Sequence, residues 1–162
     1  LGCVWWQKQW DDFFHKKDAH PKNAEDDTNP TGLDDGNRGT VLDVVKLAQA
    51  AFLIPEITKA ASTEIFSLAP KQTIGTATRT IRSTDQLLSS TLDQGRYTII
   101  AAKTGTLGEA TGYHLTLAVR DTKEEREVLV AVLGSANNPA RFSDAKALAY
   151  WAFGAYHWDA RP

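Results

Sequence analysis

Residues 97–106 read YTIIAAKTGT, an apolar run followed by a Lys-Thr-Gly tripeptide and a further threonine. The β-branched and aromatic residues at its start favour a β-strand from Tyr97 to Lys103. A tripeptide of this kind occurs by chance in many proteins, so its position at the end of an apolar strand is what gives it weight. The stretch therefore predicts a strand that brings three chemically distinct groups to one place.

The residue types of the tripeptide suit the binding of an anionic substrate. Lys103 supplies a fixed positive charge that favours an anionic intermediate or a substrate carboxylate. Thr104 offers a hydroxyl to that carboxylate, and Gly105 lacks a side chain, so a substrate backbone can pair with the strand edge. The backbone N–H of Thr106 is available to an oxyanion hole. The first three are candidate catalytic residues, and Thr106 is a candidate substrate-binding residue.

Two more strands and a helix are predicted after the tripeptide. The strands cover His114 to Arg120 and Glu127 to Leu133, and their short polar connections favour antiparallel pairing with the first strand. A helix is predicted from Pro139 to Tyr156. Its apolar face consists of Phe142, Ala145, Leu148, Ala149, Ala152 and Phe153.

The segment ahead of the tripeptide is predicted to be helical first and extended afterwards. Thr40 is a suitable N-cap for one helix, and Pro55 ends that helix and opens a second, Pro55 to Ala61. The apolar face of the first helix consists of Val41, Val44, Val45, Ala48 and Phe52. Short strands are expected over Glu64 to Leu68 and Thr73 to Arg82, and a capped helical turn over Ser83 to Leu88.

The composition is that of an ordinary globular domain. The chain has 162 residues, of which 42% are hydrophobic and 23% charged, enough for one domain that buries most of its apolar surface. Its net charge of -2 gives no electrostatic reason to expect a nucleic acid or an anionic membrane as partner. No apolar run is long enough to span a membrane, and no signal segment opens the chain. The single cysteine, Cys3, excludes an internal disulfide and has no histidine partner in a recognisable catalytic arrangement.

Residues 1–28 have the weakest structural signals in the sequence. An amphipathic helix is expected over Val4 to His15, with aromatic side chains that dock on the core. Those aromatic residues are Trp5, Trp6, Trp10, Phe13 and Phe14. The alternative is a divergent segment or one joined from other sequence. Because methionine is absent and the chain opens Leu1-Gly2-Cys3, we expect a processed, trimmed or partial chain.

Five segments resemble, in order and in spacing, the serine-type D-Ala-D-Ala carboxypeptidases of the penicillin-binding protein family. They are Asn29 to Ala48, Ser83 to Leu88, Lys103 to Leu115, Val128 to Gly134 and Arg141 to Phe153. The second is similar to the Asn-x-Leu-Leu turn of that family, and the third to its Lys-Thr-Gly strand, although Thr111 is an extra residue. The last resembles the closing Arg-x-x-Asp-Ala helix. The resemblance extends over about three quarters of the chain.

The resemblance implies a fold and an activity. The fold is α/β (α+β), a partial domain with a penicillin-binding, β-lactamase-like antiparallel sheet and flanking helices, in which residues 29–162 form the C-terminal part of a catalytic domain. The activity is removal of the terminal D-alanine from peptidoglycan stem peptides through a serine acyl-enzyme, in the periplasm or another extracytoplasmic, envelope-associated place. Peptidoglycan stem peptides and β-lactams are the implied ligands, without cofactor, metal or nucleic acid. A partial sheet exposes an edge and apolar surface, so self-association or docking of a missing N-terminal half is expected.

One departure from the family concerns the nucleophile. Catalysis there needs a Ser-x-x-Lys and a Ser-x-Asn motif ahead of the Lys-Thr-Gly strand, but no serine ahead of Lys103 lies three residues before a lysine, and Ser67 and Lys71 are one residue too far apart. Ser143-Asp144-Ala145-Lys146 and Ser135-Ala136-Asn137 fit the two patterns but follow the strand, so a helix cap and a solvated helix face are favoured for them. We expect no nucleophile in this chain, and hence an inactive isolated chain.

The remaining candidates are single residues. By resemblance Arg141 binds the substrate carboxylate, and a surface salt bridge or a cap contact is the alternative. His114 lies on a predicted strand, where a packed or solvent-facing position is favoured over catalysis. His15 and His20 lie among acidic residues, but no ligand spacing repeats, so a solvated loop is favoured over a metal site. Those acidic residues are Asp11, Asp12, Asp18 and Asp26.

Three functional hypotheses remain open at this point. The complete protein is a serine carboxypeptidase and this chain supplies one wall of its cleft, or the chain is a carboxypeptidase-derived binding or remnant domain without catalysis. The third is a split enzyme completed by a separate chain. A Ser-x-x-Lys motif encoded ahead of Leu1 distinguishes the first hypothesis from the second.

Overall fold

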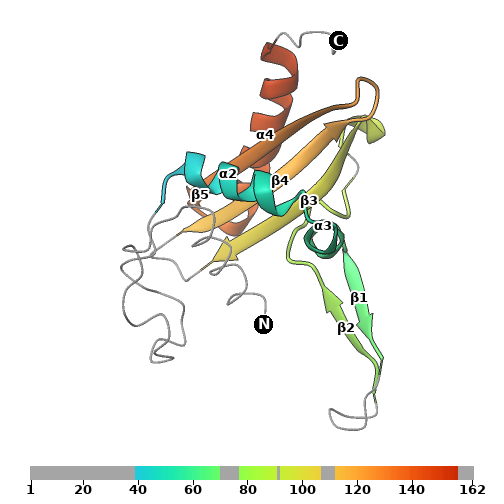
Figure 1. Cartoon of the computed structure of the whole chain (residues 1–162). Helices are drawn as coiled ribbons and strands as arrows, with labels where there is room; N and C mark the ends of the chain where they lie inside the picture. The colour runs from blue at the N-terminus through green and yellow to red at the C-terminus, as the bar shows by residue number, and fades with distance from the viewer. Residues whose placement is uncertain (1–38, 70–76, 91, 107–111, 157–162) are drawn as a thin grey trace.

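A three-stranded antiparallel sheet forms the centre of the computed structural model, which describes residues 39–69, 77–90, 92–106 and 112–156. Its strands lie in the order β3 (Tyr97–Thr106), β4 (Tyr113–Asp121) and β5 (Arg126–Ser135). Figure 1 shows the three strands side by side, with the helices around them. The predicted pairing of these segments in one antiparallel sheet is confirmed, and so is the α/β (α+β) class with flanking helices.

β3 is longer than the sequence pattern predicted. Lys103 pairs with Thr116, and the strand continues through Thr106, which pairs with Tyr113. The prediction that Lys103 ends the strand is therefore wrong by three residues, because the polar tripeptide is held in the sheet by its pairing with β4. The tripeptide belongs to the strand itself.

One helix covers each face of the sheet. α4 (Asn138–Ala155) packs on β4 and β5, and its Phe142, Ala145 and Ala149 join the main core. α2 (Val41–Ala51) crosses the other face over the same two strands (Figure 1). Alternation along β4 explains this arrangement, because side chains at successive positions point to opposite faces. All of β4 from Leu115 to Val119 is buried, so both of its faces are covered.

The helix starts follow the predicted capping rules. The Thr40 side chain accepts a hydrogen bond from the backbone N–H of Asp43, and the Asp43 carboxylate accepts one from the backbone N–H of Thr40, which makes a complete capping box. α3 (Pro55–Ala61) begins at proline as predicted. Asn137 caps α4 by accepting from the backbone N–H of Ala140 at 2.8 Å.

Two finer predictions are wrong. Val41 and Leu148, placed on apolar helix faces, are 46% and 43% exposed, because they lie at the edges of those faces rather than at their centres. The capped turn expected over Ser83 to Leu88 is present, since hydrogen-bonded turns follow Asp85 and its side chain caps them by accepting from the N–H of Leu87 at 2.9 Å.

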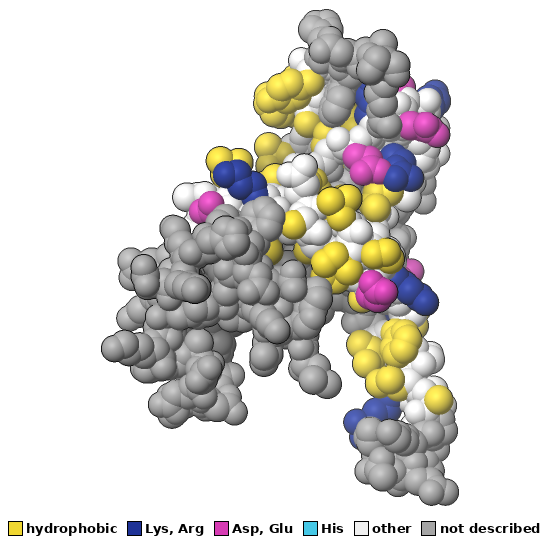
Figure 2. Space-filling view, in the orientation of Figure 1, with side chains coloured by type: hydrophobic (Ala, Val, Ile, Leu, Met, Phe, Trp, Pro, Cys, Tyr) yellow, Lys and Arg dark blue, Asp and Glu magenta, His cyan; other side chains and the backbone are white. Residues whose placement is uncertain are grey.

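A second, two-stranded sheet extends away from the main one. β1 (Ile65–Leu68) and β2 (Arg79–Arg82) pair antiparallel and project beyond α3 (Figure 1). All eight of their residues are exposed. Figure 2 shows apolar side chains gathered on this hairpin. They are Ile65, Phe66, Leu68 and Ile81.

Several sequence-based expectations lie outside the described residues. The amphipathic helix over Val4 to His15, the turn after Asn29, the first part of Thr73 to Arg82 and the extra residue Thr111 are among them. The proposed boundary between residues 1–28 and the rest also stays a prediction. The described residues therefore test the predictions for the sheet, for its helices and for the Lys-Thr-Gly strand.

Candidate functional site

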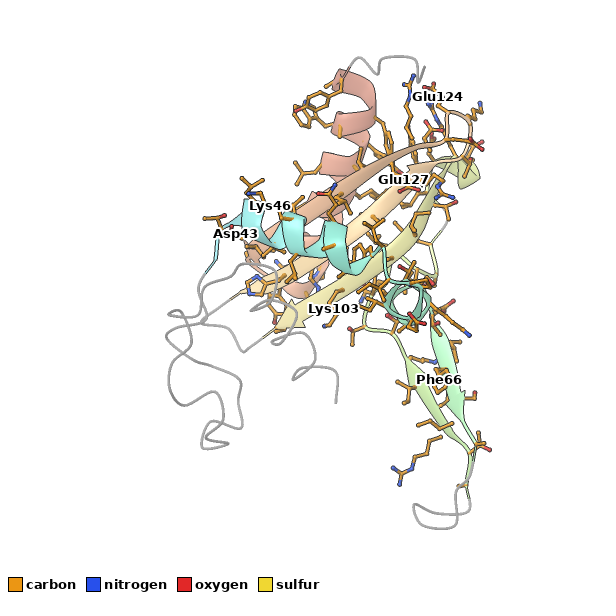
Figure 3. The ribbon with its side chains drawn as sticks, in the orientation of Figure 1. Asp43, Lys46, Phe66, Lys103, Glu124 and Glu127 are labelled. Atoms are coloured by element: carbon orange, nitrogen blue, oxygen red, sulfur yellow. The ribbon has the colours of Figure 1, made fainter. Side chains whose placement is uncertain are left out.

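The Lys-Thr-Gly tripeptide lies on an edge strand of the described sheet, because β3 pairs with β4 on one side only. Lys103 is exposed, and its ammonium group contacts the carbonyl oxygen of Thr104. Figure 3 shows Lys103 near the end of β3. The structure thus presents a positive charge beside a strand edge, the arrangement that the sequence predicted for an anionic, strand-pairing ligand.

Thr104 contacts residues 83–90, which precede β3 in the sequence. Its hydroxyl oxygen lies 2.5 Å from the hydroxyl oxygen of Thr84, and either one is able to donate. Because a hydroxyl has one proton and two lone pairs, Thr104 keeps further hydrogen-bonding capacity after this contact. Residues 83–90 and the end of β3 are therefore joined at the tripeptide.

Neither the backbone conformation nor crowding by neighbouring atoms requires a glycine at position 105. Its φ is not positive, and a Cβ added there would make only an ordinary contact, 3.5 Å from the Cβ of His114. Among the described residues, nothing in its surroundings demands the loss of a side chain. Gly105 thus leaves this part of the edge of β3 without a side chain.

Arg141 lies beneath the end of β3, at the start of α4. Its side chain is buried, only 4% exposed, and its Nη1 donates to the carbonyl of Gly105 at 3.2 Å, the hydroxyl of Thr106 at 3.1 Å and the carbonyl of His114 at 3.3 Å. Burial lowers the pKa of this guanidinium. The surface salt bridge considered for Arg141 from the sequence is excluded by its burial. One arginine thus ties α4 to both strands that carry the site.

Thr106 completes this set of contacts. Its hydroxyl donates to the carbonyl of Gly105 at 2.7 Å and accepts from Arg141. The arginine also stacks over aromatic rings, 4.8 Å from the ring centre of Phe142 and 5.7 Å from that of Tyr113. The five residues singled out from the sequence, Lys103 to Thr106 and Arg141, therefore lie together at one end of β3 and β4.

Sequence reasoning missed Asp85. This carboxylate is buried, 3% exposed, on the turn that carries Thr84. Burial raises its pKa, while the N–H of Leu87 and the charge of Arg141 act in the opposite direction. The similarity of Ser83 to Leu88 to an Asn-x-Leu-Leu turn was a usable signal, because Asp85 stands in the place of that asparagine and puts a carboxyl group there.

His114 is a packed strand residue next to the site. Its Nδ1 accepts a hydrogen bond from the backbone N–H of Gly134 at 3.0 Å, and its side chain is partly buried. Burial lowers the pKa of the imidazole, and the Arg141 charge lowers it further. Of the two non-catalytic positions that the sequence favoured, packed or facing solvent, His114 has the partly packed one.

The two motif-like sequences after β3 have structural roles. Ser135 is buried and its hydroxyl donates to the carboxylate of Asp144 at 2.9 Å, while Asn137 caps α4. Ser143 and Lys146 are exposed on α4. The cap that the sequence favoured describes Asn137, and the solvated helix face describes Ser143 and Lys146. Ser135 differs, because it is buried and bonded to Asp144.

The described residues contain no metal-binding cluster, since no three His, Cys, Asp or Glu side chains among them are placed to hold an ion. None of the helices that these residues form has the length and apolar character needed to cross a membrane.

Comparison with known proteins connects this geometry to one solved structure. No family model and no curated protein match the chain. Penicillin-binding protein D2 from Listeria monocytogenes, solved in its cefotaxime-bound form, matches with a TM-score of 0.57 and 24% sequence identity. The match covers 75% of this chain but 45% of that one, so the chain spans less than half of the length of the protein it resembles. At this identity the likeness shows the fold, a partial domain of the penicillin-binding protein type.

Proposed function

We propose that this chain is the C-terminal part of the catalytic domain of a serine-type D-Ala-D-Ala carboxypeptidase that acts on peptidoglycan stem peptides. The observation that carries the proposal is the Lys-Thr-Gly tripeptide on an edge strand of a penicillin-binding protein fold. The solved protein of that fold was crystallised with a β-lactam bound, which supports a β-lactam as a second ligand class. Extracytoplasmic action at the cell envelope belongs to the same proposal.

Each residue of the strand edge has its own role in the proposed binding. Lys103 supplies positive charge for the terminal carboxylate or for a developing oxyanion. Thr104 adds a hydroxyl to the carboxylate, and the bare edge at Gly105 lets the peptide backbone pair with β3. The backbone N–H of Thr106 contributes to the oxyanion hole. Arg141, with its Nη1 bonded to three protein acceptors, supports this edge from beneath.

The acyl-enzyme step needs a nucleophilic serine in a Ser-x-x-Lys motif. This sequence has no such motif ahead of Lys103. The nucleophile would attack the carbonyl of the penultimate D-alanine, the terminal D-alanine would leave as the amine, and water would release the peptide. In the proposal an N-terminal part of the domain provides that serine, and the isolated chain binds without turnover. A non-catalytic binding or remnant domain derived from a carboxypeptidase is the alternative.

Peptide binding to the isolated chain tests the proposal. Amide NMR signals of Lys103 to Thr106 are expected to shift on addition of millimolar N-acetyl-Lys-D-Ala-D-Ala, and to shift far less with the L-Ala-L-Ala peptide. Replacement of Lys103 by alanine should abolish the difference between the two peptides. Equal responses to the two stereoisomers, or no response at these four amides, would contradict the proposed ligand. A Ser-x-x-Lys motif in the same reading frame ahead of Leu1 separates the enzyme from the remnant.

A further inference from the structure

The hydroxyl of Thr84 meets the hydroxyl of Thr104 near the end of β3. Their oxygen atoms lie 2.5 Å apart, and the contact is exposed to solvent. Because water can reach both hydroxyls, neither would be left without a hydrogen-bond partner if the contact were lost. The contact therefore contributes little to stability. Its consequence is chemical, because it decides which hydroxyl proton stays available to a ligand.

Thr84 is held in place by the residues on either side of it. On one side, the backbone N–H of Ser83 donates to the carbonyl of Glu64 at 2.7 Å. On the other side, Asp85 and Leu87 are buried, and the N–H of Leu87 donates to the Asp85 carboxyl at 2.9 Å. Since these neighbours are anchored, the exposed Thr84 presents its hydroxyl to β3 from a defined direction.

The direction of this hydrogen bond decides what Thr104 can do for a ligand. A threonine hydroxyl has one proton, so Thr104 has none left if it donates to Thr84 and keeps it if Thr84 donates instead. A carboxylate only accepts hydrogen bonds, and it therefore selects the second arrangement. The other threonine hydroxyl at this strand end is already committed, because Thr106 donates to the carbonyl of Gly105 at 2.7 Å. Thr104 is thus the hydroxyl whose proton Thr84 can leave free for an anion.

We propose that Thr84 is a positioning residue for the ligand carboxylate: it donates to Thr104, and Thr104 in turn donates to the carboxylate next to the charge of Lys103. In such a chain each hydrogen bond polarises and strengthens the other. The inference rests on the proposed function and deepens it, since it makes a terminal carboxylate, rather than an amide, the group that depends on position 84. A terminal carboxamide can donate to Thr104 and leave its proton to Thr84, so it needs no donor from Thr84.

The first test compares two peptides on the isolated chain, N-acetyl-Lys-D-Ala-D-Ala and its C-terminal amide, by NMR titration. Thr84→Val should weaken binding of the acid about fivefold and change binding of the amide by less than about twofold. Thr84→Ala removes the hydroxyl without placing a methyl group against Thr104, and it should give the same result. Thr84→Ser restores a hydroxyl and should recover the parent affinity. Thr98→Val and Thr98→Ala, at an exposed threonine near the start of β3, are the matched controls and should change neither affinity.

The second test needs no ligand. If the contact with Thr84 fixes the side chain of Thr104, Thr84→Ala should spread that side chain over more than one χ1 rotamer, whereas Thr84→Ser should not. Coupling constants between the Thr104 methyl carbon and the backbone nitrogen and carbonyl carbon measure the rotamer populations by NMR. Urea unfolding of the same variants should give midpoints close to that of the parent, because the contact is exposed.

The results separate failure of this inference from failure of the proposed function. If Thr84→Val and Thr84→Ala bind the acid as tightly as the parent, and the parent prefers D-Ala-D-Ala to L-Ala-L-Ala, the proposed function stands and the role of Thr84 is overturned. Equal weakening of acid and amide, or an unchanged rotamer population of Thr104 in Thr84→Ala, overturns it as well. A parent that binds neither peptide contradicts the proposed function, and the role of Thr84 in binding a carboxylate is then overturned with it.

Discussion

The guanidinium of Arg96 binds the carboxylate of Asp121 at the end of the β3–β4 pair opposite the Lys-Thr-Gly tripeptide. Its Nη2 and Nε lie 2.8 Å and 3.0 Å from the same carboxylate oxygen, Oδ2. The other oxygen, Oδ1, accepts from the backbone N–H groups of Lys123 and Glu124. This one buried carboxylate therefore fixes the start of β3 and the turn between β4 and β5.

Asp121→Asn should lower the melting temperature by several degrees. The amide has the same shape, but it brings two donors to a site that supplies only donors and removes the charge that Arg96 faces. Thermal unfolding followed by circular dichroism measures the effect. Glu127→Gln, at an exposed ion pair, is the control and should change the melting temperature little.

The same carboxylate gives stability a dependence on pH. Burial alone would raise the pKa of Asp121, but the Arg96 hydrogen bond and the two backbone N–H groups outweigh it, so the folded-state pKa lies below the ordinary value. A depressed folded-state pKa stabilises the fold above the unfolded value, about 3.9, and that stabilisation is lost as pH falls through the folded value. Below about pH 4 the parent should lose stability more steeply than Asp121→Asn. Parallel acid titrations of the two proteins would contradict this assignment.

Gly112→Ala should be strongly destabilising, by about 2 to 3 kcal/mol. The φ of Gly112 is +73°, and an added Cβ would lie 2.8 Å from the Cα of Gly134. Gly134→Ala is the matched control, because its φ is +75° but an added Cβ meets nothing within 4 Å. That variant carries the backbone strain alone, about 1 kcal/mol. If Gly112→Ala and Gly134→Ala lose the same free energy of unfolding in urea, the short distance between the two backbones adds no cost of its own.

The order and type of elements were predictable because the local signals were strong. Thr40, Pro55 and Asn137 are helix-start residues, and the three main strands have the β-branched content of strands. The end of β3 was not predictable from local pattern, because Gly105 and its threonine neighbours stay in the strand through pairing with β4 and contacts to Arg141.

The chemical site was predicted only in part, for a similar reason. Lys103 and its neighbours form a contiguous motif, and Arg141 came from a resemblance to the closing helix. Asp85 falls in the segment similar to the Asn-x-Leu-Leu turn, but only the fold shows that this turn reaches the same strand end and that the Asp85 side chain is buried. The sequence also did not predict that Arg141 is buried, since a charged residue near a helix start is usually exposed.

The purified 162-residue chain should form no covalent adduct with a fluorescent penicillin. No serine ahead of Lys103 has a lysine three residues later, and Ser143 lies on the exposed face of α4. Gel fluorescence and intact mass spectrometry measure labelling, with Ser143→Ala as the matched variant. Stoichiometric labelling that disappears in Ser143→Ala would show that the motif on α4 is a nucleophile after all.

Lys103→Ala, in a protein that also carries the proposed N-terminal part of the domain, should slow acylation far more than it weakens the fold. Lys103 is exposed and its ammonium group contacts a carbonyl next to it in the chain, so its removal should cost stability about 0.5 kcal/mol or less. Loss of a charge directed at a developing oxyanion or a bound carboxylate costs on the order of 3 kcal/mol, roughly a hundredfold in rate. Stopped-flow acylation by a β-lactam and urea unfolding give the two numbers for one variant. A structural lysine would show the opposite pattern, a lower unfolding midpoint with a normal acylation rate. Lys46→Ala, at another exposed lysine on α2, is the control and should leave both quantities unchanged. If Lys103→Ala acylates at the parent rate, the tripeptide has no catalytic role and its place on the edge of β3 is coincidental.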